Sequence, residues 1–389
     1  MPIVITILIC FSLAFVSSAS NGSAVDGHFW QKQLLWASIG FVLYFAISRL
    51  HYRIFLEIGH WIYYISLGLL VAVLFLGKDT GWGASRWLNL GPLSFQPSEL
   101  AKLGTLLMVC SILARSEVGT IGKSLIALLK VALAVLIPFI LIFAQPDLGS
   151  AMVLPPMTLA LLYVSNLTSS FFRAVALIAL ALLALTAVDL TRYVSYVKAN
   201  EMTFSDTDSH KGFKGILPLK DYQRNRILAF VAPDLVDPSG TGVYWNQKQS
   251  LITVGSGGLI GKGWREGTQA KLGYLPQTVA HNDFIFSVIA EETGFVGAVI
   301  ILGLFAILIA LTLMVASRSS DRYGRLLAVG IGTILMTHIF VNVAMTIGLM
   351  PIKGIPLPFV SYGGSFLLSA FILMGMVTSV DRFRLTRAQ

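Results

Sequence analysis

The sequence predicts an all-α, polytopic integral membrane protein with about ten transmembrane helices and one long extracytoplasmic loop. Of its 389 residues, 56% are hydrophobic and only 12% are charged. The mean hydropathy is +0.78, and apolar runs recur from one end of the chain to the other. This composition lies far outside that of soluble globular proteins. We therefore expect residues 1–389 to form a single membrane domain.

Polar segments separate the apolar runs, several of which are shorter than the ~20 residues that a membrane helix needs. The first run ends in small residues, as a signal peptide does, but no positive segment precedes it, and this favours a transmembrane helix. The expected spans are Ile3–Val16, Leu34–Ile47, Ile58–Leu76, Leu100–Leu113, Leu125–Ala144, Ser150–Val164, Phe171–Val188, Phe284–Ala316, Leu326–Ile347 and Phe366–Val380.

Lysines and arginines in the short loops predict the orientation of the chain. With ten spans, these basic residues all fall on one side, which should be the cytoplasmic side, and both termini then lie inside. The residues are Arg49, Arg53, Arg115, Lys123, Arg173, Arg318, Arg322, Arg325, Arg382, Arg384 and Arg387. The formal net charge of +9 suits anionic membrane lipids or phosphate ligands and does not indicate nucleic acid.

The opposite side carries the long loop, from about Asp189 to Asp283. Its part from Tyr196 to Arg226 is polar, and we expect it to be partly disordered. Glycines at 255–263 resemble a phosphate-binding loop, but Ser256 and Gly263 break the required spacing. Trp245, Trp264 and Tyr274 are expected to anchor the loop at the membrane interface.

Asp283 stands where this loop meets the span that starts at Phe284. The apolar run continues to Ala316, so a helix of this length should project beyond the ~30 Å hydrocarbon core. Asp283 would then lie on the water side, near the positive end of the helix dipole. Asp283 is either a catalytic or ligand-binding carboxylate, or else Asn282 or Asp283 simply caps the helix.

Other polar groups gather at the same membrane surface. Glu99 and Lys102 share one face of a helix, Asp147 follows Pro146 in a turn between two spans, and Arg86 and Lys353 lie in outer loops. Each has an ordinary explanation as an ion pair, a cap or a lipid contact. Together they place acids and bases on one face, where charge is costly and usually functional. Such a mixture suits an anionic, lipid-linked substrate.

Five motifs give the sequence a strong family resemblance. They are ASRWL at 84–88, FQPSELAK at 95–102, QPDLG at 145–149, HNDFIF at 281–286 and PLPFVSYGGS at 356–365. In this order they resemble the SEDS family (shape, elongation, division and sporulation), and the GKGW and GIPLP segments resemble its rod-elongation members. The match departs from the family pattern at the turn 276–280, at Asn282 in place of threonine, and at Phe366 in place of serine.

The resemblance implies an inverting peptidoglycan glycosyltransferase of the bacterial cytoplasmic membrane, with its active site on the outer face. Its substrate would be lipid II, and its partners a class B penicillin-binding protein (the transpeptidase), the elongation machinery and membrane lipids. The family's essential aspartate corresponds to Asp283. The expected substrate-binding residues are Arg86, Glu99, Lys102, Asp147, His281, Lys353 and Ser361.

In the expected reaction, a sugar hydroxyl of the acceptor attacks the anomeric carbon of the donor, and undecaprenyl pyrophosphate leaves. Asp283 would act as the general base or as a metal ligand. Cationic side chains or a bound Mg²⁺ or Mn²⁺ would offset the charge of the pyrophosphate. The alternatives are a lipid II flippase, favoured by Glu291 and Glu292 inside a span, and a non-catalytic scaffold.

The partner is expected to pack on small residues, because membrane helices associate through close packing rather than through the hydrophobic effect. Gly294, Gly297, Ala298 and Gly303, together with the following span, offer such a surface.

Overall fold

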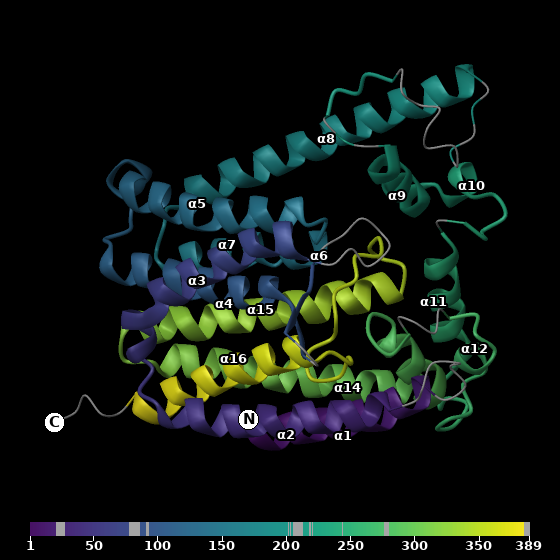
Figure 1. The fold of residues 1–389 in the computed structure, drawn as a ribbon. Helices are drawn as coiled ribbons and strands as arrows, with labels where there is room; N and C mark the ends of the chain where they lie inside the picture. The colour runs from purple at the N-terminus through teal and green to yellow at the C-terminus, as the bar shows by residue number, and fades with distance from the viewer. Residues whose placement is uncertain are drawn as a thin grey trace.

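A computed structural model describes residues 1–20, 28–77, 86–90, 93–200, 202, 204, 213–217, 219, 221–242, 244–275 and 280–384. Within them, eight helices are long and apolar enough to cross a membrane (Figure 1). These are α1 (Pro2–Ala19), α3 (Ile54–Leu76), α4 (Pro97–Arg115), α5 (Ile121–Ala144), α8 (Ser169–Ala199), α14 (Ile285–Arg318), α15 (Arg322–Thr346) and α16 (Gly364–Phe383).

Two further helical segments coincide with the two remaining apolar runs. They are α2 (Phe29–Arg49) and the pair α6 (Leu148–Ala151) and α7 (Leu154–Val164). The prediction of an all-α membrane protein is therefore confirmed. The structure adds one small element that the sequence does not predict, an antiparallel hairpin of β1 (Leu88–Leu90) and β2 (Leu93–Phe95), in which Leu88 pairs with Phe95.

The centre of the bundle is formed by α4, α15 and α16, whose apolar side chains are largely buried. Glycines let neighbouring helices approach closely, as is usual in membranes: a Cβ on Gly40 of α2 would meet the Phe371 ring of α16 at 2.1 Å. In contrast, α8 lies along the outside of the bundle (Figure 1). None of its residues from Ser169 to Val188 is buried.

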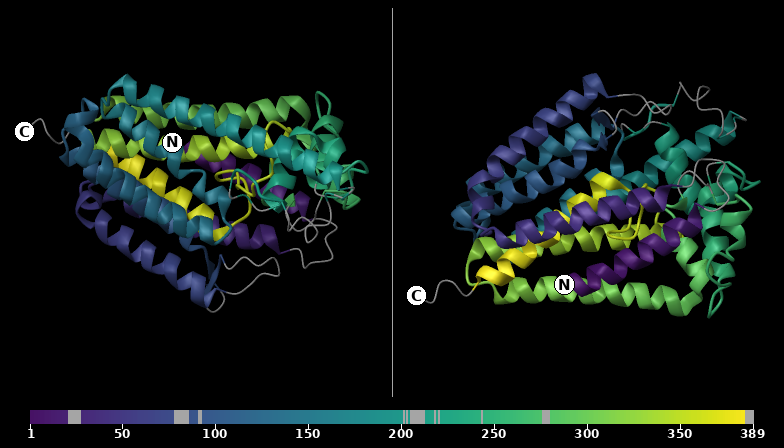
Figure 2. Two further views of the ribbon diagram at one scale, coloured as in Figure 1. Left: turned by 90° about the horizontal axis from the view of Figure 1, so that it is seen from above. Right: turned by 60° about the horizontal axis from the view of Figure 1, so that its bottom comes forward.

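The predicted basic side forms one end of the bundle. Tyr52, after α2, donates a hydrogen bond of 2.7 Å to Asp321, before α15. Arg322 donates a hydrogen bond of 2.7 Å to the backbone oxygen of Ser116, after α4. The connections that carry the arginines and lysines are thus joined to one another. Helices α9 to α12 gather at the other end (Figures 1 and 2).

The long loop from 189 to 283 contains several helices that the sequence analysis did not assign. Helix α8 runs on to Ala199, and α9 (Asp221–Val231), α10 (Pro233–Val236), α11 (Trp245–Ser256) and α12 (Thr268–Lys271) follow. The Asp189 carboxylate accepts a hydrogen bond of 2.9 Å from buried Arg224 and joins α8 to α9. Part of the segment 196–226, in which disorder was expected, lies outside the described residues (201, 203, 205–212, 218 and 220), and its two ends belong to α8 and α9. Trp264 contacts α1 through a hydrogen bond of 3.2 Å to Ala14 O.

Helix α14 is not continuous, contrary to the prediction. Gly294 adopts φ 69° and ψ −166° and divides it into a first part, ending at Thr293, and a span that runs to Arg318. A turn after α11 satisfies the backbone groups freed at the kink: Phe295 N donates to Gly258 O at 2.8 Å, and Gly263 N donates to Glu292 O at 3.0 Å. The part that precedes the kink leads back to Asp283.

Candidate active site

A polar cavity of about 370 Å³ opens among α2, α4, α15, α16 and the turns that precede α6 and α14. Its polar lining consists of Arg86, Gln96, Glu99, Asp147, Ser150, Asn282, Asp283 and His338. Its aromatic lining consists of Trp36, Trp87, Tyr362 and Phe366. Four of the predicted site residues, Arg86, Glu99, Asp147 and Asp283, therefore come together from segments far apart in the sequence.

Asp283 is held at this cavity by contacts to the backbone around it. Asn342 Nδ2 donates a hydrogen bond of 3.0 Å to Asp283 O, and Ser361 Oγ donates one of 2.6 Å to Asn282 O. Gly354 passes so close that an added Cβ would lie 3.3 Å from Asp283 Oδ2. The N-cap residue of α14 is Phe284, and no side chain caps this helix. The interpretation of Asp283 or Asn282 as a cap is therefore wrong.

Burial raises the pKa of Asp283 from 3.8 to about 6. The positive charge of Arg86 opposes this shift in pKa, and the negative charge of Asp147 adds to it. A carboxylate with this pKa is largely ionised at pH 7 and is more basic than an exposed aspartate. Asp283 is therefore suited to accept a proton in the cavity.

Asp147 joins three segments of the site. Its carboxylate caps α6 by accepting a hydrogen bond from Ser150 N at 3.2 Å, so the predicted capping role is present. It also accepts hydrogen bonds from Gln96 Nε2 at 2.9 Å and Ser98 Oγ at 3.1 Å, at the start of α4. Arg86 is tied to the same turn, because its Nε donates to Gln145 O at 3.2 Å. Arg86 thus faces the cavity beside two aspartates.

Glu99 and Lys102 form a buried ion pair of 2.9 Å. Glu99 lines the cavity, and Lys102 lies behind it, where its Nζ is 3.0 Å from His338 Nε2. His338 is not among the site residues predicted from the sequence. A signal was present, since a histidine inside the apolar run from Leu326 to Ile347 is costly unless it is paired or functional.

Three other predicted residues do not line the cavity. His281 packs between the rings of Phe29 and Tyr362, with centroid distances of 4.3 and 5.3 Å. Ser361 accepts a hydrogen bond from Leu357 N and holds the Asp283 turn through Asn282 O. The Lys353 side chain lies outside the lining, and burial, with nearby Arg226, lowers its pKa.

Glu291 and Glu292 bind the loop that closes the kink of α14. Glu291 accepts hydrogen bonds from Lys262 Nζ at 2.6 Å and Gln269 N at 3.0 Å. Glu292 accepts one from Arg265 N at 3.1 Å and one from the Ser18 hydroxyl. The two acids precede the spanning part of the helix. They therefore fasten the GKGW segment and do not form a polar site halfway across the membrane.

The described residues contain no group of three or more His, Cys, Asp or Glu side chains able to hold a metal ion. A dedicated protein cage is thus absent from that part of the chain. Asp283 still fits the simpler pattern in which Mg²⁺ is held by one or two carboxylates together with substrate phosphates and water.

Comparison with known proteins places these features in a family. Residues 1–386 match the family model of the cell cycle proteins FtsW, RodA and SpoVE. Peptidoglycan glycosyltransferase MrdB of Escherichia coli (strain K12) is 34% identical over 385 residues, covering 99% of this chain and 93% of the relative. Peptidoglycan glycosyltransferase RodA of Treponema pallidum (strain Nichols) is 31% identical over 426 residues, with coverages of 97% and 96%.

Solved structures share the fold. A chain from a study of polymerization and crosslinking by a peptidoglycan synthase complex superimposes with a TM-score of 0.73 at 31% identity, covering 98% of this chain and 97% of that one. The crystal structure of RodA, the rod shape determining protein of Thermus thermophilus, gives a TM-score of 0.66 at 27% identity, with coverages of 98% and 96%.

Proposed function

The chain belongs to the FtsW/RodA/SpoVE family of cell cycle proteins, and we propose that it polymerises lipid II into glycan strands at a site centred on Asp283. The curated relatives are named peptidoglycan glycosyltransferases, and the chain is an enzyme of this class. The observation that carries the proposed site is the Asp283 carboxylate, which has a raised pKa and lines a polar cavity.

Asp283 is the proposed general base. As the acceptor hydroxyl attacks the anomeric carbon of the donor, a new C–O bond forms and the C–O bond to undecaprenyl pyrophosphate breaks. The hydroxyl proton passes to Asp283, and the anomeric configuration inverts. A positioned base typically contributes about 10²–10⁴-fold to the rate. The fixed backbone around Asp283 supports this role because it keeps the carboxylate in place.

The pyrophosphate needs positive charge as it leaves. Arg86 is the proposed source, since it is the permanent cation among the lining residues and lies beside Asp283 and Asp147. A Mg²⁺ or Mn²⁺ ion held by Asp283 and the phosphate oxygens would supply further neutralisation. Loss of activity in EDTA, restored by either ion, is the result expected if Asp283 is a metal ligand.

The cavity is proposed to face the outside of the cytoplasmic membrane, with both termini inside. The basic connections lie at the end of the bundle opposite α9 to α12 (Figure 1), which agrees with the positive-inside rule. The two lipid tails would lie along the apolar helix faces beside the cavity.

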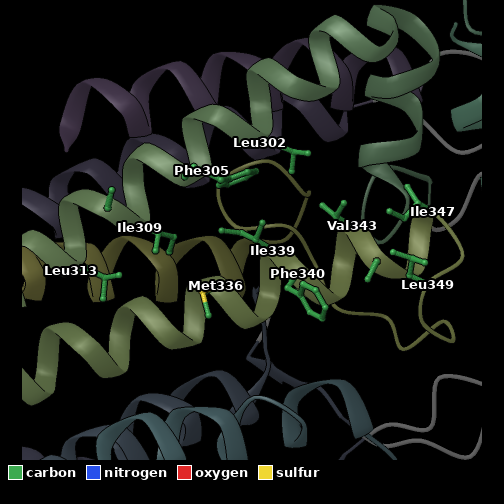
Figure 3. A pocket seen from close by; sticks show the side chains of 13 residues that line it. Leu302, Phe305, Ile309, Leu313, Met336, Ile339, Phe340, Val343, Ile347 and Leu349 are labelled. Atoms are coloured by element: carbon green, nitrogen blue, oxygen red, sulfur yellow. The ribbon is translucent and has the colours of Figure 1, made fainter. Parts of the chain in front are cut away.

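A groove between α14 and α15 is the proposed seat for a single membrane helix of a class B penicillin-binding protein. The groove has a volume of about 550 Å³ and an apolar lining that includes Ala306, Ala310 and Ala344 (Figure 3). Small residues of this kind let a second helix approach closely. The predicted surface at Gly294 and Gly297 needs correction: both are buried at the kink of α14.

Purified protein in liposomes with lipid II tests the function. Glycan polymer on a gel is the expected product, and it should form without the partner's transpeptidase activity. Movement of lipid II between leaflets without polymer would instead support the flippase, and neither activity would support the scaffold.

A further inference from the structure

The ammonium group of Lys102 is surrounded by three partners in the membrane-embedded part of the bundle. Glu99 Oε1 lies 2.9 Å away, His338 Nε2 lies 3.0 Å away, and the centre of the Phe366 ring lies 5.5 Å away. His338 also stacks on Phe366, with ring centroids 4.8 Å apart. We call Glu99, His338 and Phe366 the Lys102 cage. An ammonium group has three hydrogens, and the cage provides three partners for it.

The tautomer of His338 follows from its second contact. His338 Nδ1 lies 3.3 Å from Pro356 O, and a carbonyl oxygen can only accept. Nδ1 therefore carries the hydrogen, and the lone pair of Nε2 accepts from Lys102. The histidine is neutral, and it ties the cage to the segment that passes Asp283.

One carboxylate oxygen of Glu99 is buried beside the cavity without a hydrogen bond from the part of the chain that the structure describes. Glu99 is a buried residue of the lining, with a side chain that is 6% exposed, and its Oε2 has no hydrogen-bond partner among the described residues. A buried carboxylate oxygen without a donor is costly. A ligand in the cavity that places a donor against this oxygen would remove the cost, and a sugar carries hydroxyl and acetamido N–H groups that can donate.

We propose that Glu99 Oε2 accepts a hydrogen bond from an amino sugar of the substrate, and that Lys102, His338 and Phe366 are positioning residues that keep this oxygen available. The inference rests on the proposed function and deepens it. It changes the role expected for Lys102 from substrate binding to positioning, because its ammonium group is engaged by the cage. It also gives a role to Phe366, which departs from the family pattern.

The cage makes a distinctive prediction for His338. In His338→Leu, the Lys102 ammonium group loses an acceptor. We expect it to bind both oxygens of Glu99, so that Oε2 can no longer accept a hydrogen bond from the substrate. We expect KM for lipid II to rise about tenfold while kcat stays within about threefold, as for the loss of one hydrogen bond to a charged group. His338→Gln restores an acceptor and should recover most of the affinity. Thr333→Val, on the same helix, is the control, since among the described residues its hydroxyl donates to Val329 O in its own helix.

A substrate series tests the hydrogen bond itself. Wild-type protein and Glu99→Gln are compared on lipid II analogues that each lack one sugar hydroxyl or the acetamido N–H. For wild type, one analogue should lower kcat/KM about tenfold relative to lipid II. For Glu99→Gln, the same analogue should lower kcat/KM little relative to lipid II, because the substitution has already removed the same contact. Losses that add for every analogue, or His338→Leu with wild-type KM, would overturn the proposal.

The proposed function and the role of the Lys102 cage can fail separately. If wild-type protein makes no polymer from lipid II, the proposed function is wrong. If wild type polymerises normally and the cage variants keep the wild-type KM, only this inference is wrong. Glu99→Gln leaves Lys102 without a counter-charge, and this could prevent folding. In that case His338→Leu and His338→Gln still test the inference, since neither changes the charge of the site.

Discussion

The side chain of Asn342, on α15, bridges the two segments that flank the cavity: its Nδ2 lies 3.0 Å from Asp283 O and 2.7 Å from Ile355 O. One buried amide thus fixes the backbone of the proposed base against the proline-rich segment. A small displacement of a reacting group can cost about 10²-fold in rate. The position of Asp283 therefore depends on a residue that does not touch the cavity.

Asn342→Leu should lower kcat about ten- to a hundredfold, because both hydrogen bonds are lost and the turn is free to shift. KM should change less, since the lining side chains remain. Polymer formation from lipid II over a range of concentrations measures both constants, with Thr333→Val as the matched control. A kcat equal to that of wild type would show that the bridge has no part in positioning Asp283.

The rate of polymerisation should fall as the pH drops through about 6, because a base with the raised pKa of Asp283 becomes protonated there. Arg86 lowers this pKa and Asp147 raises it. In a plot of rate against pH, Arg86→Gln should therefore move the fall in rate on the acid side (the acid limb) to higher pH, and Asp147→Asn should move it to lower pH. The experiment measures the pH at which this limb lies rather than the maximal rate. Limbs that coincide for all three proteins would contradict the assignment.

Gly294→Ala should destabilise the protein by about 2–3 kcal/mol, because alanine is strained at positive φ. A Cβ there would also lie 2.3 Å from Gly261 N. Thermal unfolding in detergent measures the effect. Gly303→Ala, in the spanning part of the same helix, is the control: nothing lies within 4 Å of its Cβ position, so it should be neutral or slightly stabilising. Equal effects at the two positions would contradict the kink.

Ala306→Phe should fill the groove between α14 and α15 and weaken co-purification with a class B penicillin-binding protein. Polymerisation by the isolated chain should persist. Ala179→Phe, on the exposed face of α8, controls for added bulk. Recovery of the partner at the wild-type level with Ala306→Phe would place the partner elsewhere.

The spans could be predicted because a membrane helix requires about 20 apolar residues, and these residues are consecutive in the sequence. The kink at Gly294 could not, since the groups that satisfy it come from Gly258 to Gly263, more than thirty positions earlier. Likewise α9 is polar and depends on contacts such as that of Asp189 with Arg224. Local sequence does not contain those partners.

The candidate site shows the same division. Arg86, Glu99, Asp147 and Asp283 stand out because charges beside apolar spans are costly, and the fold brings all four to one cavity. Lys353 and Ser361 lie in an equally distinctive segment, but the direction of a side chain depends on the backbone around it. His338 could not be assigned to the site from the sequence, because its role depends on a contact with Lys102, on another helix.

Asp283→Asn tests the central claim most directly, because it keeps the size of the side chain and removes the base. Since Asp283 does not cap α14, the variant should fold, insert in the membrane and express at normal levels. Polymerisation of lipid II should fall about 10²-fold or more. Polymer at a rate near that of wild type, from correctly inserted Asp283→Asn protein, would show that Asp283 is not the catalytic carboxylate.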